Sequence, residues 1–179
     1  MRFARISTAL ATCALALTAL PGCTPNDVFA PICPQLALVK DAADLTRFNG
    51  RGEDISDLDL TARLNAVPAA CSQTKRSTVD ADLQVVVAIA RGPARTDRTA
   101  SVPYFVAVTD AAGKLIDKQN FVLGGTFPPN VDRMNATSEK LTLSFPVSDT
   151  VKAADYRIYV GFALTPQELA YNRKMAGAR

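Results

Sequence analysis

The chain has 179 residues, of which 48% are hydrophobic and 21% are charged, and its formal net charge is +3. This length favours a single domain, and so small a charge excludes the concentrated basic field that nucleic-acid binding requires. The chain also contains no histidine, so it lacks the side chain most used as a general base and as a metal ligand.

The first 22 residues have the layout of a secretory signal peptide. Arg2 and Arg5 form a positively charged start, and an apolar run from Ile6 to Leu20 follows. That run is shorter than the roughly 20 residues that a transmembrane helix needs. We therefore expect residues 1–22 to be removed, which leaves 18 basic and 17 acidic side chains and a net charge of +1.

A four-residue pattern closes this leader. Leu20-Pro21-Gly22-Cys23 resembles the lipobox of bacterial lipoproteins, with an aliphatic residue, a variable position and a small residue before the lipidated cysteine. Pro21 replaces the usual Ala, Ser or Thr. The resemblance implies cleavage before Cys23 and its acylation, and two or more acyl chains attach a protein stably to a bilayer. The alternative is ordinary signal cleavage near Gly22, which leaves Cys23 free.

Residues 23–32 then form a lipidated tether with two prolines ahead of the domain. Some bacteria place Asp directly after the lipidated cysteine to keep a lipoprotein in the inner membrane. Thr24 stands there in this chain, which favours the outer membrane, facing the periplasm.

Counting cysteines supports this interpretation. Cys13 leaves with the leader and Cys23 takes the lipid, so that Cys33 and Cys71 remain to pair in an exported compartment. In the chain-entropy model, closing a loop of about 39 residues is worth roughly 4 kcal/mol. The alternative, a metal site on the two thiols, lacks further ligands.

Residues 33–175 are predicted to be one β-sandwich domain. Apolar and polar residues alternate with period two in several short segments, as in half-buried strands, and turn residues separate them. One or two strands are predicted within 35–48, and one strand each in 57–67, 81–90, 102–109, 114–123, 141–147 and 156–163. Asp110-Ala111-Ala112-Gly113 predicts a hairpin turn. About seven strands favour an antiparallel immunoglobulin-like sandwich, and a small β-barrel is the alternative.

The pattern changes after the last strand. Thr165-Pro166-Gln167-Glu168 predicts a helix start, because Thr165 can cap, Pro166 suits the first turn and Glu168 completes a capping box. Leu169, with Tyr171 or Met175, would dock this short helix on the sandwich. Residues 176–179 are expected to form a flexible tail.

Candidate binding residues are few. Arg91, Arg95 and Arg98 lie in a Gly-Pro loop and form a candidate binding loop for anionic lipid or polymer; the alternative is a solvated loop. The densest acidic group offers oxygen ligands for calcium, although it lacks EF-hand spacing and partly falls on the polar face of a strand. This group consists of Glu53, Asp54, Asp57 and Asp59. We expect no metal and no cofactor.

No catalytic motif emerges. Ser72-Gln73-Thr74-Lys75 has the S-x-x-K form of penicillin-binding enzymes, but the companion motifs are absent. Tyr104, Tyr156 and Tyr159 fit a core or sheet face better than a ligand platform. We therefore expect a protein that is not an enzyme.

Three phrases extend the lipoprotein resemblance into the domain. Arg91-Gly92-Pro93, Tyr104 to Val108 with Asp110, and Gly161-Phe162 through Asn172-Arg173 resemble an uncharacterised family of alphaproteobacterial cell-envelope lipoproteins, over roughly residues 33–173. The resemblance implies an envelope location and no transferable activity.

These patterns together predict a membrane-anchored cell-envelope lipoprotein. Its β-sandwich would act as a non-enzymatic binding or assembly module, with the bilayer as one partner through acylated Cys23 and an envelope protein as another. A purely structural envelope lipoprotein is the alternative, followed by a periplasmic ligand carrier or enzyme, which would need a pocket with convergent polar groups.

Overall fold

A computed structural model describes residues 32–50 and 52–177. The predicted signal peptide, Cys23 and most of the tether lie outside the described residues. Strands make up about half of the described residues, and one short α-helix lies at the C-terminal end. The prediction of an all-β fold is confirmed.

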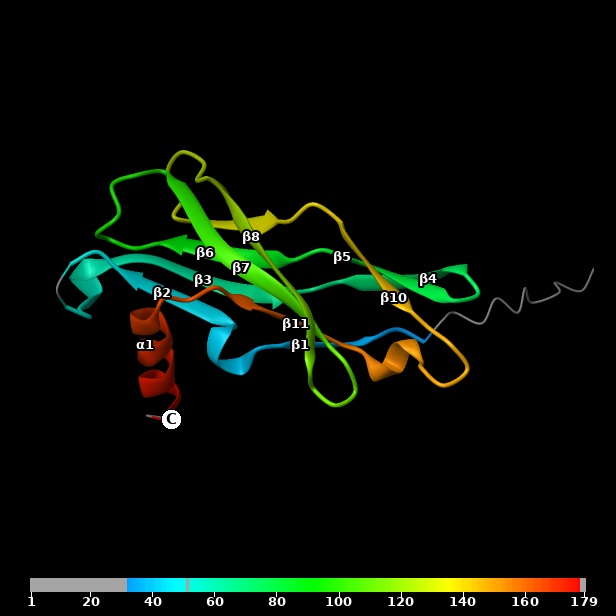
Figure 1. Cartoon of the computed structure of the whole chain (residues 1–179). Helices are drawn as coiled ribbons and strands as arrows, with labels where there is room; N and C mark the ends of the chain where they lie inside the picture. The colour runs from blue at the N-terminus through cyan, green and yellow to red at the C-terminus, as the bar shows by residue number, and fades with distance from the viewer. Residues whose placement is uncertain (1–31, 51, 178–179) are drawn as a thin grey trace, which may run out of the picture.

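Eleven strands, three 3-10 turns and one helix follow one another along the described chain (Figure 1). The strands are β1 (Gln35–Leu38), β2 (Asp44–Phe48), β3 (Leu58–Ala66), β4 (Ala69–Lys75), β5 (Thr78–Leu83), β6 (Val86–Arg91), β7 (Thr99–Thr109), β8 (Leu115–Thr126), β9 (Arg133–Thr137), β10 (Leu141–Pro146) and β11 (Arg157–Phe162). The other elements are η1 (Lys40–Ala42), η2 (Ile55–Asp57), η3 (Ala153–Asp155) and α1 (Pro166–Gly177).

The strands form two layers. One layer has the order β1-β11-β7-β8, in which β1 runs parallel to β11 and the other pairs are antiparallel. The other layer consists of the sheets β2-β3-β6-β9 and β10-β5-β4. Figure 1 shows that β4 continues β3 and that β6 continues β5, so these two sheets are the halves of one long bent layer. In the part that the structure describes each sheet is open, which is the predicted sandwich and not its barrel alternative.

The bend in the long layer is held by hydrogen bonds that replace the regular ladder. Val85 N–H donates to Ser138 Oγ at 2.9 Å, and Ser138 N–H donates to Val85 O at 2.9 Å. Gln84 N–H donates to Pro68 O at 3.1 Å. Every backbone group buried at a strand break needs such a partner, and these bonds let the layer change direction without unpaired groups at Gln84 and Val85.

The core lies between the two layers and follows the predicted alternation. The side chains of Ala81, Leu83, Val85, Val87 and Ile89 are 1% exposed or less, so the apolar face continues across the bend from β5 to β6. Burial of such a side chain contributes about 1.5–3 kcal/mol relative to exposure. The alternation therefore determines which face of the strand turns inward.

The predicted hairpin is confirmed. Asp110 N–H donates to Lys114 O at 3.0 Å, and Asp110 Oδ1 accepts from the N–H groups of Ala112 and Lys114. Gly113 has φ +81°, a left-handed conformation that glycine adopts at no steric cost. The turn joins β7 to β8, and β8 is an edge strand.

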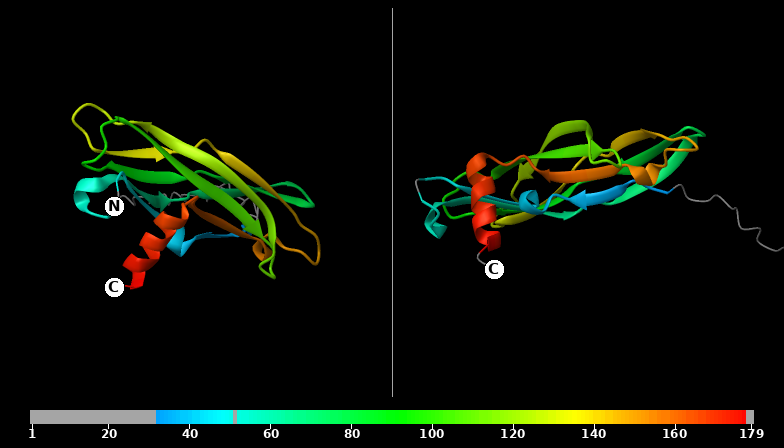
Figure 2. Two further views of the ribbon diagram at one scale, coloured as in Figure 1. Left: turned by 60° about the vertical axis from the view of Figure 1, so that its left-hand side comes forward. Right: turned by 60° about the horizontal axis from the view of Figure 1, so that its bottom comes forward.

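The C-terminal helix starts as predicted. Glu168 N–H donates to Thr165 Oγ1 at 3.2 Å, and Thr165 N–H donates to Glu168 Oε2 at 2.8 Å, which is the reciprocal capping box. The Tyr171 ring packs edge-on against Phe48 of β2, with centroids 5.2 Å apart. Met175 is 42% exposed and the helix runs on to Gly177, beyond the expected start of the tail. Figure 2 shows the helix at the end of the sandwich that carries β2.

Candidate functional site

A groove of about 960 Å³ lies between α1 and the outer face of the sheet β2-β3-β6-β9. Its floor is made of the small side chains Thr46, Thr61, Ala88 and Ala90. These positions follow from the strand alternation, because their sequence neighbours Leu45, Leu60, Val87 and Ile89 are buried in the core. The registers Thr46↔Thr61 and Thr61↔Ala90 place the floor residues side by side.

One wall of the groove is formed by α1. Tyr171, Asn172 and Met175 of α1 line one side. The amide of Asn172 donates to Asp41 O at 2.9 Å and to Asp44 O at 2.7 Å. These two bonds fasten the helix to the start of β2, so the groove wall has a fixed distance from the floor.

Some charged residues at the rim of the groove form ion pairs, and others do not. Asp44 Oδ1 lies 2.6 Å from Arg63 Nε, and the hydrogen bond and the charge of Asp44 raise the pKa of Arg63. Asp41 pairs with Arg173 at 3.1 Å. Lys40 and Arg133 make no ion pair within the described residues. The charge that the groove has available for a ligand is therefore positive.

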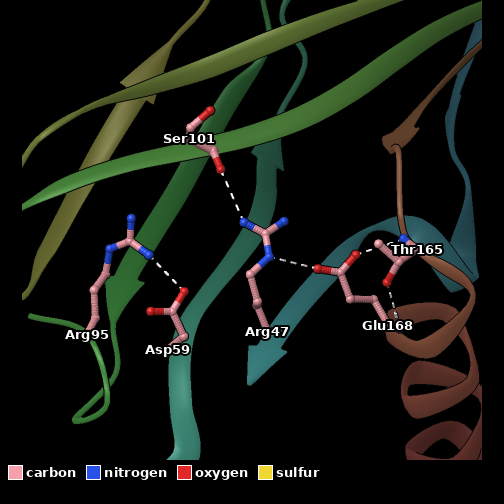
Figure 3. A network of polar contacts seen from close by, with 6 residues as sticks. All are labelled: Arg47, Asp59, Arg95, Ser101, Thr165 and Glu168. Carbon is pink, nitrogen blue, oxygen red and sulfur yellow. Dashed lines mark hydrogen bonds and ion pairs between the residues drawn. The ribbon is translucent and has the colours of Figure 1, made fainter. Parts of the chain in front are cut away.

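A buried ion pair that sequence reasoning missed holds α1 in place. Glu168 is 7% exposed, and its Oε1 lies 3.0 Å from Arg47 Nε on β2. Arg47 Nη1 also donates to Ser101 O on β7 at 3.4 Å, so the guanidinium joins the helix to both layers (Figure 3). The capping box predicts the local role of Glu168, but no sequence signal links it to a residue 121 positions away.

The three arginines of the candidate binding loop each contact a group of the protein. Arg91 Nη2 lies 2.6 Å from Asp132 Oδ1, and Arg98 Nη2 donates to Phe127 O at 2.7 Å. Arg95 Nη1 lies 2.7 Å from Asp59 Oδ2 (Figure 3), and its other nitrogens donate to Thr99 O. The loop as an anion site stays a prediction, and its cations already have intramolecular partners.

Two of the acidic residues considered for calcium form ion pairs with different cations. Glu53 Oε2 pairs with Lys174 of α1 at 2.6 Å, whereas Asp59 pairs with Arg95. Within residues 32–50 and 52–177, no three cysteine or carboxylate side chains gather closely enough to hold a metal ion. Asp59 is 8% exposed, and its ion pair explains why a charged residue can be buried there.

The remaining sequence candidates have structural roles. Ser72 and Lys75 lie in the strand β4, not at a helix start.

Tyr104 is 2% exposed and stacks on Phe121, with ring centroids 5.3 Å apart. Burial raises the pKa of the Tyr104 hydroxyl, and a hydrogen bond with Ser138 offsets part of that rise. Tyr156 OH donates to Pro146 O at 2.8 Å. Tyr104 and Tyr156 thus make core and sheet contacts, and Tyr159 lies half-buried in β11.

Comparison with protein-family models, curated proteins and solved structures found no match for this chain. Among the described residues, no helix has the length and apolar character needed to cross a membrane. The similarity to envelope lipoproteins therefore stays a prediction that rests on the residues quoted for it.

Proposed function

We propose that this chain is a cell-envelope lipoprotein, anchored to the outer membrane through acylated Cys23, whose sandwich is a non-enzymatic binding or assembly module. The observation that carries the proposal is the Cys33–Cys71 disulfide, with a Cα–Cα distance of 5.7 Å. Disulfides are typical of exported proteins. This bridge uses the two thiols that remain once Cys13 leaves with the leader and Cys23 takes the lipid.

The layout of the sandwich supports a presenting role. Cys33 precedes β1 and is joined to β4, at one end of the molecule. The helix α1 lies toward the other end, beside β2 (Figures 1 and 2), and its residues line the groove. A chain tethered before Cys33 would therefore hold the groove away from the bilayer, where a partner can reach it.

The groove suits binding better than catalysis. Its lining contains no histidine, cysteine or serine, and both of its carboxylates already pair with arginine. Acid–base and nucleophilic mechanisms most often use such a group beside a general base, and the Lys40, Thr46, Thr61 and Tyr171 side chains of the lining have no histidine or unpaired carboxylate of the lining to act as one. Lys40 and Arg133 instead present positive charge over a floor of small side chains. We propose an extended, acidic segment of an envelope protein as the occupant of the groove.

The groove proposal predicts a position-specific and charge-dependent contact. With p-benzoylphenylalanine in place of Asn135, which lines the groove, irradiation of intact cells should attach a partner peptide rich in Asp and Glu. Adding Arg133→Glu should lower that yield about tenfold, since reversing a charge of a binding site costs on the order of 1.4 kcal/mol or more. The yield is measured by immunoblot and the attached peptide by mass spectrometry.

The control places the same photo-reactive residue at Asp149, an exposed position outside the groove. It should give no adduct. The acidic occupant would be contradicted if Arg133→Glu left the adduct yield at Asn135 unchanged. An attached peptide without an excess of Asp and Glu would contradict it as well. No adduct at either position would favour the purely structural lipoprotein.

The anchor is tested at Cys23 itself. Cys23→Ser should abolish incorporation of radiolabelled palmitate and shift the chain from the membrane fraction to the periplasmic fraction, because the thioether that carries the lipid cannot form. Cys13→Ser is the matched control, since it removes a leader cysteine and should leave labelling and fractionation unchanged. Membrane retention with full labelling in Cys23→Ser would refute the anchor.

A further inference from the structure

The edge strand β8 is the least protected edge of the sandwich. It has twelve residues, nearly all exposed, and pairs only with β7 among the described strands. Its side chains Leu115, Ile116 and Val122 are 54%, 54% and 70% exposed. Native proteins normally shorten, cover or charge such an edge, because its unpaired N–H and C=O groups attract another strand.

The other edge strands of the described sheets are short, covered, cross-linked or ended by proline. β1 has four residues and β9 has five. β2 is covered by α1 through Arg47 and Glu168, and β4 is joined to Cys33 by the disulfide. β10 ends on Pro146. β8 stands out by combining length, exposure and apolar side chains.

The charged side chains of β8 do not block strand pairing at its free edge. Lys118 Nζ lies 4.6 Å from the centre of the Phe105 ring on β7, so the ammonium turns back over the sheet in a cation–π contact. Asp117 Oδ2 accepts from Gln119 Nε2 at 2.8 Å on the other face. The bulge at Ile116 lies near the start of the strand, so the open backbone from Lys118 onward is accessible to a further strand.

Along β8, backbone N–H and C=O groups point alternately toward β7 and away from it. This alternation determines which residues of β8 can bind a further strand. Phe127 N–H donates to Arg98 O, and Ala163 N–H donates to Pro103 O. Bonded pairs alternate along antiparallel strands, so even residues of β7 bond to β8 and odd ones to β11. With Tyr104 opposite Phe121, the even residues of β8 direct their N–H and C=O groups outward. These residues are Lys118, Asn120 and Val122, whereas at Ile116 a β-bulge interrupts the alternation, because Val108 pairs with Asp117 and Thr109 with Leu115.

We propose that β8 pairs antiparallel with β8 of a second copy of this chain, about a twofold axis at Gln119. In this register Ile116 lies opposite Val122 and Lys118 opposite Asn120, each twice, which is the self-complementary pattern of a twofold interface. The two Lys118–Asn120 pairs exchange backbone hydrogen bonds, and the two Ile116–Val122 pairs add apolar side-chain contacts. The two four-stranded layers then join into one layer of twice the width.

The neighbouring registers fit less well. Outward-facing residues must lie opposite outward-facing residues, so the register changes only in whole steps of the alternation. One step places Lys118 opposite Lys118, and like charges directly opposite each other are destabilising. The step in the other direction places Lys118 opposite Val122 and Ile116 opposite Gly124, which removes the apolar pair. The side chains of β8 therefore favour the axis at Gln119.

A cysteine at the axis tests both the partner and the register. Gln119 would face Gln119 as a non-bonded pair with Cα atoms about 4.5 Å apart, which a disulfide spans. Full-length Gln119→Cys, expressed with its leader and oxidised in the cell envelope, should give a reducible band of twice the chain mass. Lys118→Cys, opposite Asn120, should give at least about fivefold less. The wild-type chain gives the background from its own cysteines.

A charge on β8 tests the same contact without an added thiol. In full-length chain extracted in mild detergent, Val122→Lys should convert the dimer to monomer in sedimentation, because it places two lysines opposite Ile116. Val131→Lys, at a valine 40% exposed outside β8, should leave the dimer intact. Equal cross-linking of Lys118→Cys and Gln119→Cys, a wild-type monomer, or a Gln119→Cys band that joins a different protein would each overturn the proposal.

Discussion

Replacing Cys33 and Cys71 together by serine should lower the free energy of unfolding by about 4 kcal/mol in the chain-entropy model. The two cysteines are 38 positions apart, and their bridge joins the segment before β1 in one layer to β4 in the other. Without it the unfolded chain regains the freedom of the whole loop. For a domain of this size the melting temperature should fall by about 10 °C.

Urea denaturation of the oxidised chain, the reduced chain and the double variant measures this effect. The reduced wild type should match the Cys33→Ser/Cys71→Ser variant, since both have lost the same cross-link. Thiol alkylation should modify the two cysteines only after reduction. Rapid alkylation of both in the native chain, or identical midpoints for all three samples, would count against the bridge.

The second large effect is expected at Glu168. Changing it to alanine should cost about 2–3 kcal/mol, because breaking a buried ion pair leaves the remaining charge without its partner. Glu168 also accepts from Thr165 N–H in the capping box, and an N-terminal cap contributes about 1 kcal/mol. The figure stays below the usual range for buried pairs because the Arg47 side chain is 33% exposed and can reach water.

Chemical denaturation gives the size of this effect, and limited proteolysis of α1 gives its location. Gln167→Ala is the matched control, because Gln167 is the exposed neighbour in the same helical turn and its loss should change stability by less than about 0.5 kcal/mol. Glu168→Gln should fall between the two, since an amide oxygen can keep only one of the two contacts. If Glu168→Ala behaved like Gln167→Ala, the helix would be held by Tyr171 and Asn172 instead.

Several features of this fold were predictable from the sequence because their causes are local. The period-two runs predicted the buried face of β5 and β6, since each apolar residue gains free energy only on the inner side. The turn at Asp110 and Gly113 and the capping box at Thr165 and Glu168 depend on residues within one turn of each other. The Cys33–Cys71 pair followed from counting the thiols left in an exported chain.

Other features of the fold escaped sequence reasoning. β4 and β9 were not predicted, because strands with both faces largely exposed carry no apolar alternation. The segment 35–48 was predicted to hold one or two strands and holds β1 and β2, but their separation into different layers was not predicted. The break between β5 and β6 depends on Ser138, which lies more than fifty residues away.

The sequence by itself determined that this protein is a β-sandwich with a C-terminal helix and one disulfide, and it predicted an anchor at Cys23. Only the tertiary structure decided which charged side chains are paired and which surfaces are left open. The contacts of Arg91, Arg95 and Arg47, the positive rim of the groove and the open edge of β8 all depend on which strands become neighbours. Which strands become neighbours depends on burial and pairing between residues far apart in the chain, and a local sequence pattern does not contain this information.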